Sequence, residues 1–100
     1  MKIVIIEDEH LASNYLKSIL EQQSIISISE ITVLKSVKDA VAFFNKNTVD
    51  LAFMDIHLGD GKSLDIFEQT IISCPVIFIT AYDSYAVKVF KHFTIDYLLK

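Results

Sequence analysis

The stretch DLAFMDIHLGDG, residues 50–61, carries the strongest indication of the fold. Its apolar run, 51–54, is typical of a strand that is buried on both faces. The run ends abruptly at Asp55, and a loop containing Gly59 follows. A carboxylate set against a buried strand is costly unless something compensates it. The rest of the chain must therefore supply the groups that Asp55 meets.

Four further apolar runs predict strands like this one, and most of them are rich in β-branched or aromatic residues. Segments in which apolar residues recur with helical spacing lie between the runs. This alternation predicts an α/β fold with a parallel sheet and helices on both of its faces. The expected strands are 2–6, 30–34, 51–54, 76–79 and 95–99.

Four helices are expected, and Ser36 with Asp39 predicts a capped start for the second. The chain ends at Lys100, where a doubly wound sheet of five strands usually continues into a fifth helix. We therefore expect one domain, 1–100, that lacks its final helix and leaves part of a sheet face bare, which favours dimerisation. The residues expected to face the core are Leu11, Ala12, Tyr15, Leu16, Ile19 and Leu20, then Ala40, Val41 and Phe44, then Leu64, Phe67 and Ile71, then Ala86, Val89, Phe90 and Phe93.

Composition excludes several classes of protein. With 52% hydrophobic and 22% charged residues the chain is not a disordered one. No apolar stretch reaches the roughly 18–20 residues of a membrane span, and acids interrupt the first run too early for a signal peptide. The net charge of −4 and the absence of arginine argue against direct nucleic-acid binding. A single cysteine, Cys74, adds to the expectation of a cytoplasmic protein.

Polar residues follow four of the five expected strands: Glu7 with Asp8, Asp55, Thr80 and Lys100. Ends of parallel strands meet at one edge of a sheet, where ligands of such folds bind. Clustered carboxylates suit Mg²⁺, and a hydroxyl with an ammonium suits an anion beside it. These are the parts of a phosphoryl-transfer site. Because no nucleotide-binding glycine loop is present, the phosphoryl group must come from elsewhere, and a carboxylate can receive it.

Each of these residues also has an ordinary explanation when it is taken singly. Asp55 fits a helix cap or a turn, and the acids at 7–9 fit a solvated first helical turn. Thr80 fits a turn residue and Lys100 an exposed terminal lysine. The coincidence at four strand ends, rather than any one residue, supports the site.

With IVIIEDE, LAFMDIHLGDG, VIFITAYDS and DYLLK in this order, the chain closely resembles the receiver domain of bacterial response regulators. The stretch TAYDSYAVKVFKHFTIDYLLK, residues 80–100, is most similar to receivers that precede a LytTR-type DNA-binding domain. The resemblance implies a flavodoxin-like, doubly wound sheet of five parallel strands in the order 2-1-3-4-5. Gly59 and Ser63 depart from the proline and glycine that are frequent in the family, which predicts a differently shaped loop after Asp55.

The resemblance also implies a role for each residue of the site. Asp55 would accept the phosphoryl group, Thr80 would hydrogen-bond it, and Lys100 would pair with it. Tyr97 matches an aromatic residue that turns inward when the domain switches. The implied cofactor is Mg²⁺, with Glu7, Asp8, Asp55 and the backbone carbonyl of His57 as its ligands.

By the same resemblance, the phosphoryl donor is a sensor histidine kinase, and the switch controls an output such as transcription. The DNA-binding output domain would belong to the full-length chain, and the receiver would assist its own phosphorylation without being an enzyme. Two alternatives remain open. One is a pseudo-receiver that acts without phosphate. The other is a phosphatase of the haloacid-dehalogenase type, which would need a second Asp where His57 stands.

Overall fold

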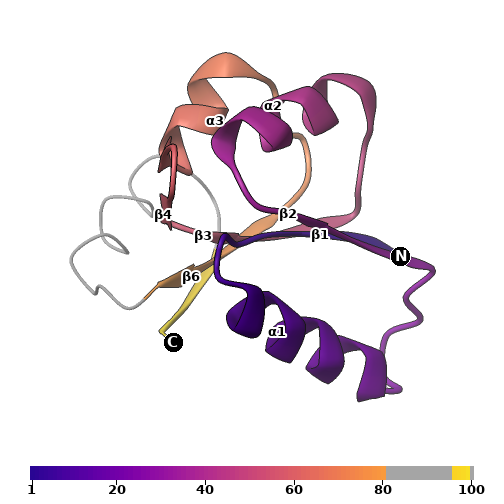
Figure 1. Cartoon of the computed structure of the whole chain (residues 1–100). Helices are drawn as coiled ribbons and strands as arrows, with labels where there is room; N and C mark the ends of the chain where they lie inside the picture. Colours follow the sequence, from indigo (N-terminus) through magenta and orange to yellow (C-terminus); the bar gives the residue numbers. More distant parts are fainter. Residues whose placement is uncertain (81–95, 100) are drawn as a thin grey trace.

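The computed structural model describes residues 1–80 and 96–99, with the backbone alone for Thr80 and 96–99. Its central feature is a parallel sheet of five strands (Figure 1). The strand order is β2-β1-β3-β6-β7, which is the predicted order 2-1-3-4-5 and confirms the flavodoxin-like fold. The strands are β1 (Lys2–Ile6), β2 (Glu30–Leu34), β3 (Leu51–Asp55), β6 (Val76–Thr80) and β7 (Asp96–Leu99).

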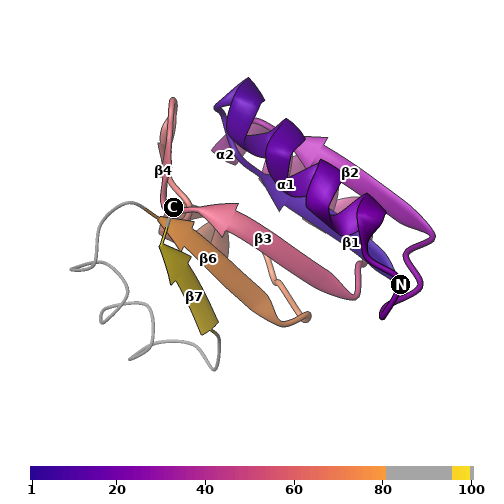
Figure 2. The ribbon, with the colours of Figure 1, turned by 90° about the horizontal axis from the view of Figure 1, so that it is seen from below.

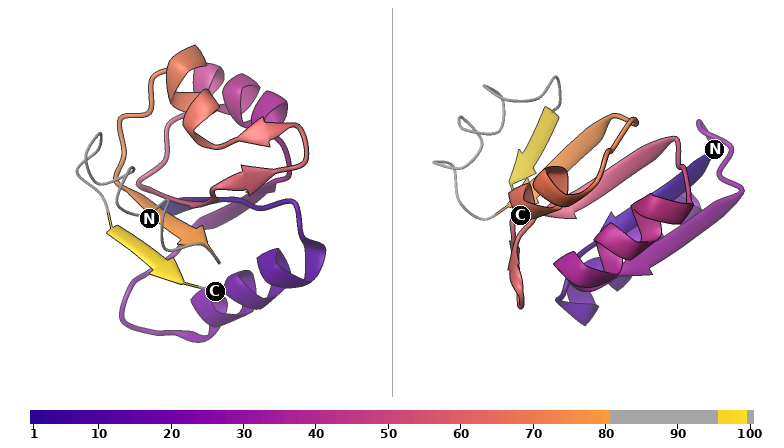
Figure 3. Two further views of the ribbon diagram at one scale, coloured as in Figure 1. Left: turned by 90° about the vertical axis from the view of Figure 1, so that its left-hand side faces the viewer. Right: turned by 90° about the horizontal axis from the view of Figure 1, so that it is seen from above.

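Helices lie on both faces of this sheet. Helix α1 (His10–Gln22) covers one face, and α2 (Val37–Lys46) and α3 (Leu64–Gln69) cover the other (Figures 1 and 3). The α2–α3 side holds the larger apolar core, in which Met54 and Phe78 are completely buried. The helix predicted around 86–93 lies outside the described residues.

Among the described residues, α1 is the helix that covers the other face of the sheet, and it covers only part of it. Figure 2 shows α1 over β1 and β2, and no helix within 1–80 lies over β6 on this side. A cavity of about 390 Å³ remains between α1 and the sheet. Its lining is largely apolar, with Leu16 from α1 and Phe53 and Ile79 from the sheet, and it reaches Glu7 and Asp55 at the strand ends.

The expected core face of α1 was wrong for three residues. Leu11, Tyr15 and Ile19 are 83%, 72% and 47% exposed. The helix instead turns Leu16 and Leu20 onto the sheet. Tyr15 and Ile19 line the open cavity between α1 and the sheet, and Leu11 lies outside that cavity.

The third helix is shorter than its apolar pattern predicted. Helix α3 ends at Gln69, so Ile71 follows it in a loop and is 87% exposed. By contrast, the predicted cap of α2 is confirmed, since the backbone amide of Asp39 donates to Ser36 Oγ at 3.0 Å.

A short antiparallel hairpin between β3 and α3 was not predicted. It pairs β4 (His57–Leu58) with β5 (Gly61–Lys62) and turns at Gly59 and Asp60. We call 57–62 the β4–β5 hairpin. Two-residue strands carry too little periodicity to be seen in a sequence.

Candidate functional site

The sheet register brings together the acids that end β1 and β3. Ile6 is level with Met54 in the parallel β1–β3 pair, so the next residues along, Glu7 and Asp55, come side by side. The backbone amide of Glu7 still donates to Leu34 O at 2.9 Å, which holds this end of β1 in the sheet. The carboxylates therefore start from a rigid edge rather than from a loose loop.

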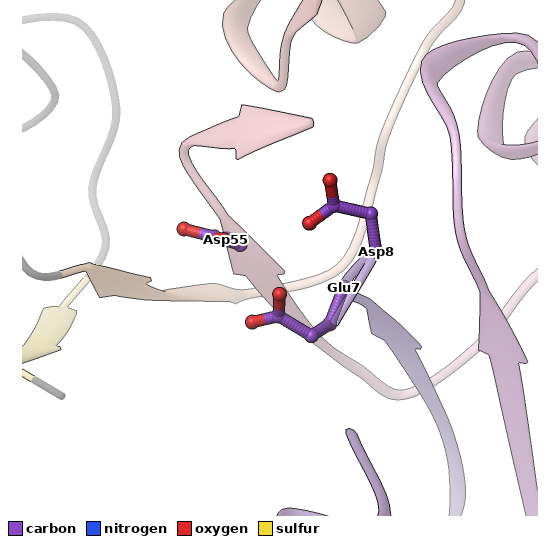
Figure 4. Close-up of side chains that lie close together, drawn as sticks. All are labelled: Glu7, Asp8 and Asp55. Atoms are coloured by element: carbon purple, nitrogen blue, oxygen red, sulfur yellow. The ribbon is translucent and has the colours of Figure 1, made fainter. Parts of the chain in front are cut away.

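The carboxylates of Glu7, Asp8 and Asp55 form one cluster (Figure 4). Each offers an oxygen, and these oxygens lie within 4.8 Å of one another. Glu7 and Asp55 are only 4% and 8% exposed, whereas Asp8 is open to solvent. Glu7 Oε1 also accepts a hydrogen bond of 3.1 Å from the amide of Glu9. The cluster thus has a buried floor and one solvent-facing member.

Three like charges this close repel one another, and a cation would relieve the repulsion. The donor set fits Mg²⁺, a hard cation that prefers carboxylate oxygens and keeps several waters. Two oxygens that both bind one Mg²⁺ at about 2.1 Å can be at most about 4.2 Å apart. An oxygen set within 4.8 Å reaches that limit with a small side-chain movement. Glu7, Asp8 and Asp55 could therefore hold such an ion.

The backbone beyond Asp55 is tied back to it. Ser63 is completely buried, and its Oγ donates a hydrogen bond to the backbone carbonyl of Asp55. The amide of Ser63 donates to Ile56 O at 2.8 Å. This residue was not among the predicted site residues, because a serine inside a loop gives no sequence signal of a buried contact.

The remaining predicted site residues are placed in part. Strand β6 pairs with β3 so that Asp55 is level with Ile79. Thr80 is the next and last residue of β6, so the backbone of Thr80 lies at the same sheet edge as Asp55. Tyr97 lies in β7 opposite Phe78. The side chains of Thr80 and Tyr97, and the whole of Lys100, lie outside what the structure describes. His57 begins β4, two residues after Asp55.

The sequence-family model of the response regulator receiver domain matches residues 3–100 of the chain. The chain belongs to the response regulator receiver family. Receiver domains are modules of two-component response regulators and are generally not enzymes. Among the curated relatives, sensory transduction protein LytT of Bacillus anthracis is 35% identical over 103 residues. That match covers all of this chain and 41% of LytT, so the chain spans about two fifths of its relative's length. It agrees with the predicted LytTR-type assignment.

Solved receiver structures share the fold. The response regulatory domain of protein mrkE from Klebsiella pneumoniae superposes with a TM-score of 0.83 at 30% identity, covering 100% of this chain and 83% of that one. The Mn²⁺-bound form of response regulator Rcp1 has a TM-score of 0.82 at 21% identity, covering 99% and 80%. Within the described part of this receiver, no helix is both long and apolar enough to cross a membrane.

Proposed function

We propose that this receiver domain accepts a phosphoryl group on Asp55 in the presence of Mg²⁺ and switches conformation in response. The observation that carries the proposal is the carboxylate cluster, in which Asp55 lies with Glu7 and Asp8 at one sheet edge. Three carboxylates within 4.8 Å of one another repel, and a bound cation would relieve that repulsion.

The transfer itself asks little of the protein beyond position and charge. A carboxylate oxygen of Asp55 attacks the phosphorus of a phosphohistidine on a sensor histidine kinase. A P–O bond forms while the P–N bond breaks, and the imidazole nitrogen keeps the electron pair. Thr80 and Lys100 are proposed to hydrogen-bond and pair with the transferred group.

Glu7, Asp8, Asp55 and the backbone carbonyl of His57 are the proposed holders of Mg²⁺. When bound, the ion neutralises charge on the phosphoryl oxygens and on the carboxylates. The Mn²⁺-bound form of Rcp1, which has the same fold, supports a divalent cation here.

The new charge on Asp55 then biases a two-state element. We propose that Thr80 and Tyr97 report it, and that a DNA-binding output domain in the full-length protein reads it to control transcription. The length of LytT beyond the matched region supports a further domain in the full-length protein.

The test is the intact mass of the chain after incubation with Mg²⁺ and acetyl phosphate. A gain of one phosphoryl group that disappears with EDTA and in Asp55→Asn is expected. Asp50→Asn is the matched control, because Asp50 precedes the same strand at its other end and accepts from the amide of Lys2 at 2.6 Å. A gain that persists in Asp55→Asn would refute the assignment of Asp55. The absence of any gain would favour a pseudo-receiver that acts without phosphate.

A further inference from the structure

The β4–β5 hairpin is anchored to a helix that lies far from it in sequence. Asp60, at the turn of the hairpin, reaches the first turn of α2. Its Oδ1 accepts from the amide of Val37 at 2.8 Å, and its Oδ2 accepts from the amide of Lys38 at 3.1 Å. These two donors hold the pKa of the Asp60 carboxyl below its ordinary value. One side chain therefore joins the hairpin to α2 through two charge-assisted hydrogen bonds.

The same turn also faces the carboxylate cluster. A Cβ placed on Gly59 would lie 3.7 Å from Asp8 Oδ2, so a side chain at this position would contact the solvent-facing member of the cluster. On the other side, a Cβ on Gly61 would lie 3.6 Å from Val37 Cγ2 and 3.0 Å from Asp65 Oδ2. Gly61 also has a φ of 151°, which favours glycine. The turn thus lies between Asp8 and the start of α2.

A hairpin of two-residue strands is not stable by itself. Its base is fixed by Ser63, which bonds to the carbonyls of Asp55 and Ile56. Its tip is fixed by Asp60. The backbone from His57 to Gly59 lies between these two anchors, directly beside the site.

We propose that Asp60 is a positioning residue for the metal site. By joining the tip of the β4–β5 hairpin to α2, it holds the backbone of His57 and Gly59 at a fixed distance from Asp8 and Asp55. Metal ligands must be held to within about 0.5 Å, which an unanchored hairpin does not provide. The inference rests on the proposed function, because its readout is Mg²⁺ binding.

The experiment compares Asp60→Ala, Asp60→Asn and Ser36→Ala with the unchanged chain. Mg²⁺ affinity is measured by titration calorimetry, and the rate of phosphorylation by acetyl phosphate is followed by intact mass. Ser36→Ala is the matched control, since Ser36 caps the same helix through Asp39 and has no bond to the hairpin among the described contacts. It weakens the start of α2 without releasing the turn.

Asp60→Ala is expected to weaken Mg²⁺ binding about tenfold, the usual order for losing a group that orients metal ligands. Asp60→Asn should recover part of the loss, because its one amide oxygen still accepts from an α2 amide. Ser36→Ala should bind Mg²⁺ as the unchanged chain does.

Unchanged Mg²⁺ affinity in Asp60→Ala, or an equal loss in Ser36→Ala, would overturn the positioning role while leaving the proposed function intact. If the unchanged chain binds no Mg²⁺ and gains no phosphoryl group, the proposed function fails and this inference fails with it.

Discussion

Replacement of Asp55 by Asn should stabilise the chain when no metal is present. Asp55 is 8% exposed and shares its corner with Glu7 and Asp8. Asn keeps the size of the side chain and one carbonyl oxygen, and the change removes one negative charge from the cluster. In the unfolded chain Asp55 is far from Glu7 and Asp8, so its repulsion with them is a cost of the folded state alone.

The size of the effect follows from the distances. Two unit charges 4.8 Å apart repel by about 3.5 kcal/mol at an effective dielectric of 20 and by about 0.9 kcal/mol in water. Because Asp8 is open to solvent, the repulsion between Asp8 and Asp55 should lie near the lower value. We expect a net stabilisation of about 2 kcal/mol, which at a urea dependence of about 2 kcal/mol/M raises the unfolding midpoint by roughly 1 M.

The assay is urea unfolding in EDTA and again in excess Mg²⁺. Glu68→Gln, on the exposed side of α3, changes the net charge equally and controls for general repulsion. Mg²⁺ at ten times its dissociation constant should stabilise the unchanged chain by about 1.4 kcal/mol and Asp55→Asn by less. In EDTA, the urea midpoint of Asp55→Asn should be higher than that of Glu68→Gln. An equal or lower midpoint would refute the idea that charge repulsion within the cluster destabilises the folded chain.

Three further outcomes are expected. Ser63→Ala should lower the free energy of unfolding by about 1–3 kcal/mol in urea titration, since the carbonyl of Asp55 loses a buried donor; an unchanged midpoint would contradict this contact. The bonds from Val37 and Lys38 lower the pKa of Asp60, so their stabilisation is present above about pH 4 and is lost as the pH falls through the lowered value. Asp60→Asn should therefore reduce the loss of unfolding free energy at acidic pH, measured by urea titration at several pH values. An unchanged pH dependence would contradict the stabilising role of the charged Asp60 carboxylate. Leu11→Ala should change the free energy of unfolding by no more than about 0.5 kcal/mol, because the Leu11 side chain is 83% exposed. A larger loss, measured by thermal unfolding, would indicate that another part of the protein covers the Leu11 side chain.

Much of the fold was predictable because its signals are local. The runs at 2–6 and 51–54 are nearly all apolar, and both became strands buried on both faces. Ser36 and Asp39 predicted the start of α2 because a cap needs only residues three apart. Periodicity predicted that α1 is a helix, but not which of its apolar residues are buried. Which residues of α1 are buried depends on which part of the sheet the helix packs against, and a pattern within the helix does not contain this information.

The candidate site divides in the same way. Glu7, Asp8 and Asp55 were predicted to meet because parallel strands end at one edge, a rule that needs only the strand positions. Asp60 and Ser63 emerged only from the tertiary structure. Asp60 caps a helix 23 residues earlier in the chain, and Ser63 bonds to a carbonyl eight residues before it. Sequence patterns record spacings along one element, whereas these contacts join elements whose separation is set by how the helices pack on the sheet.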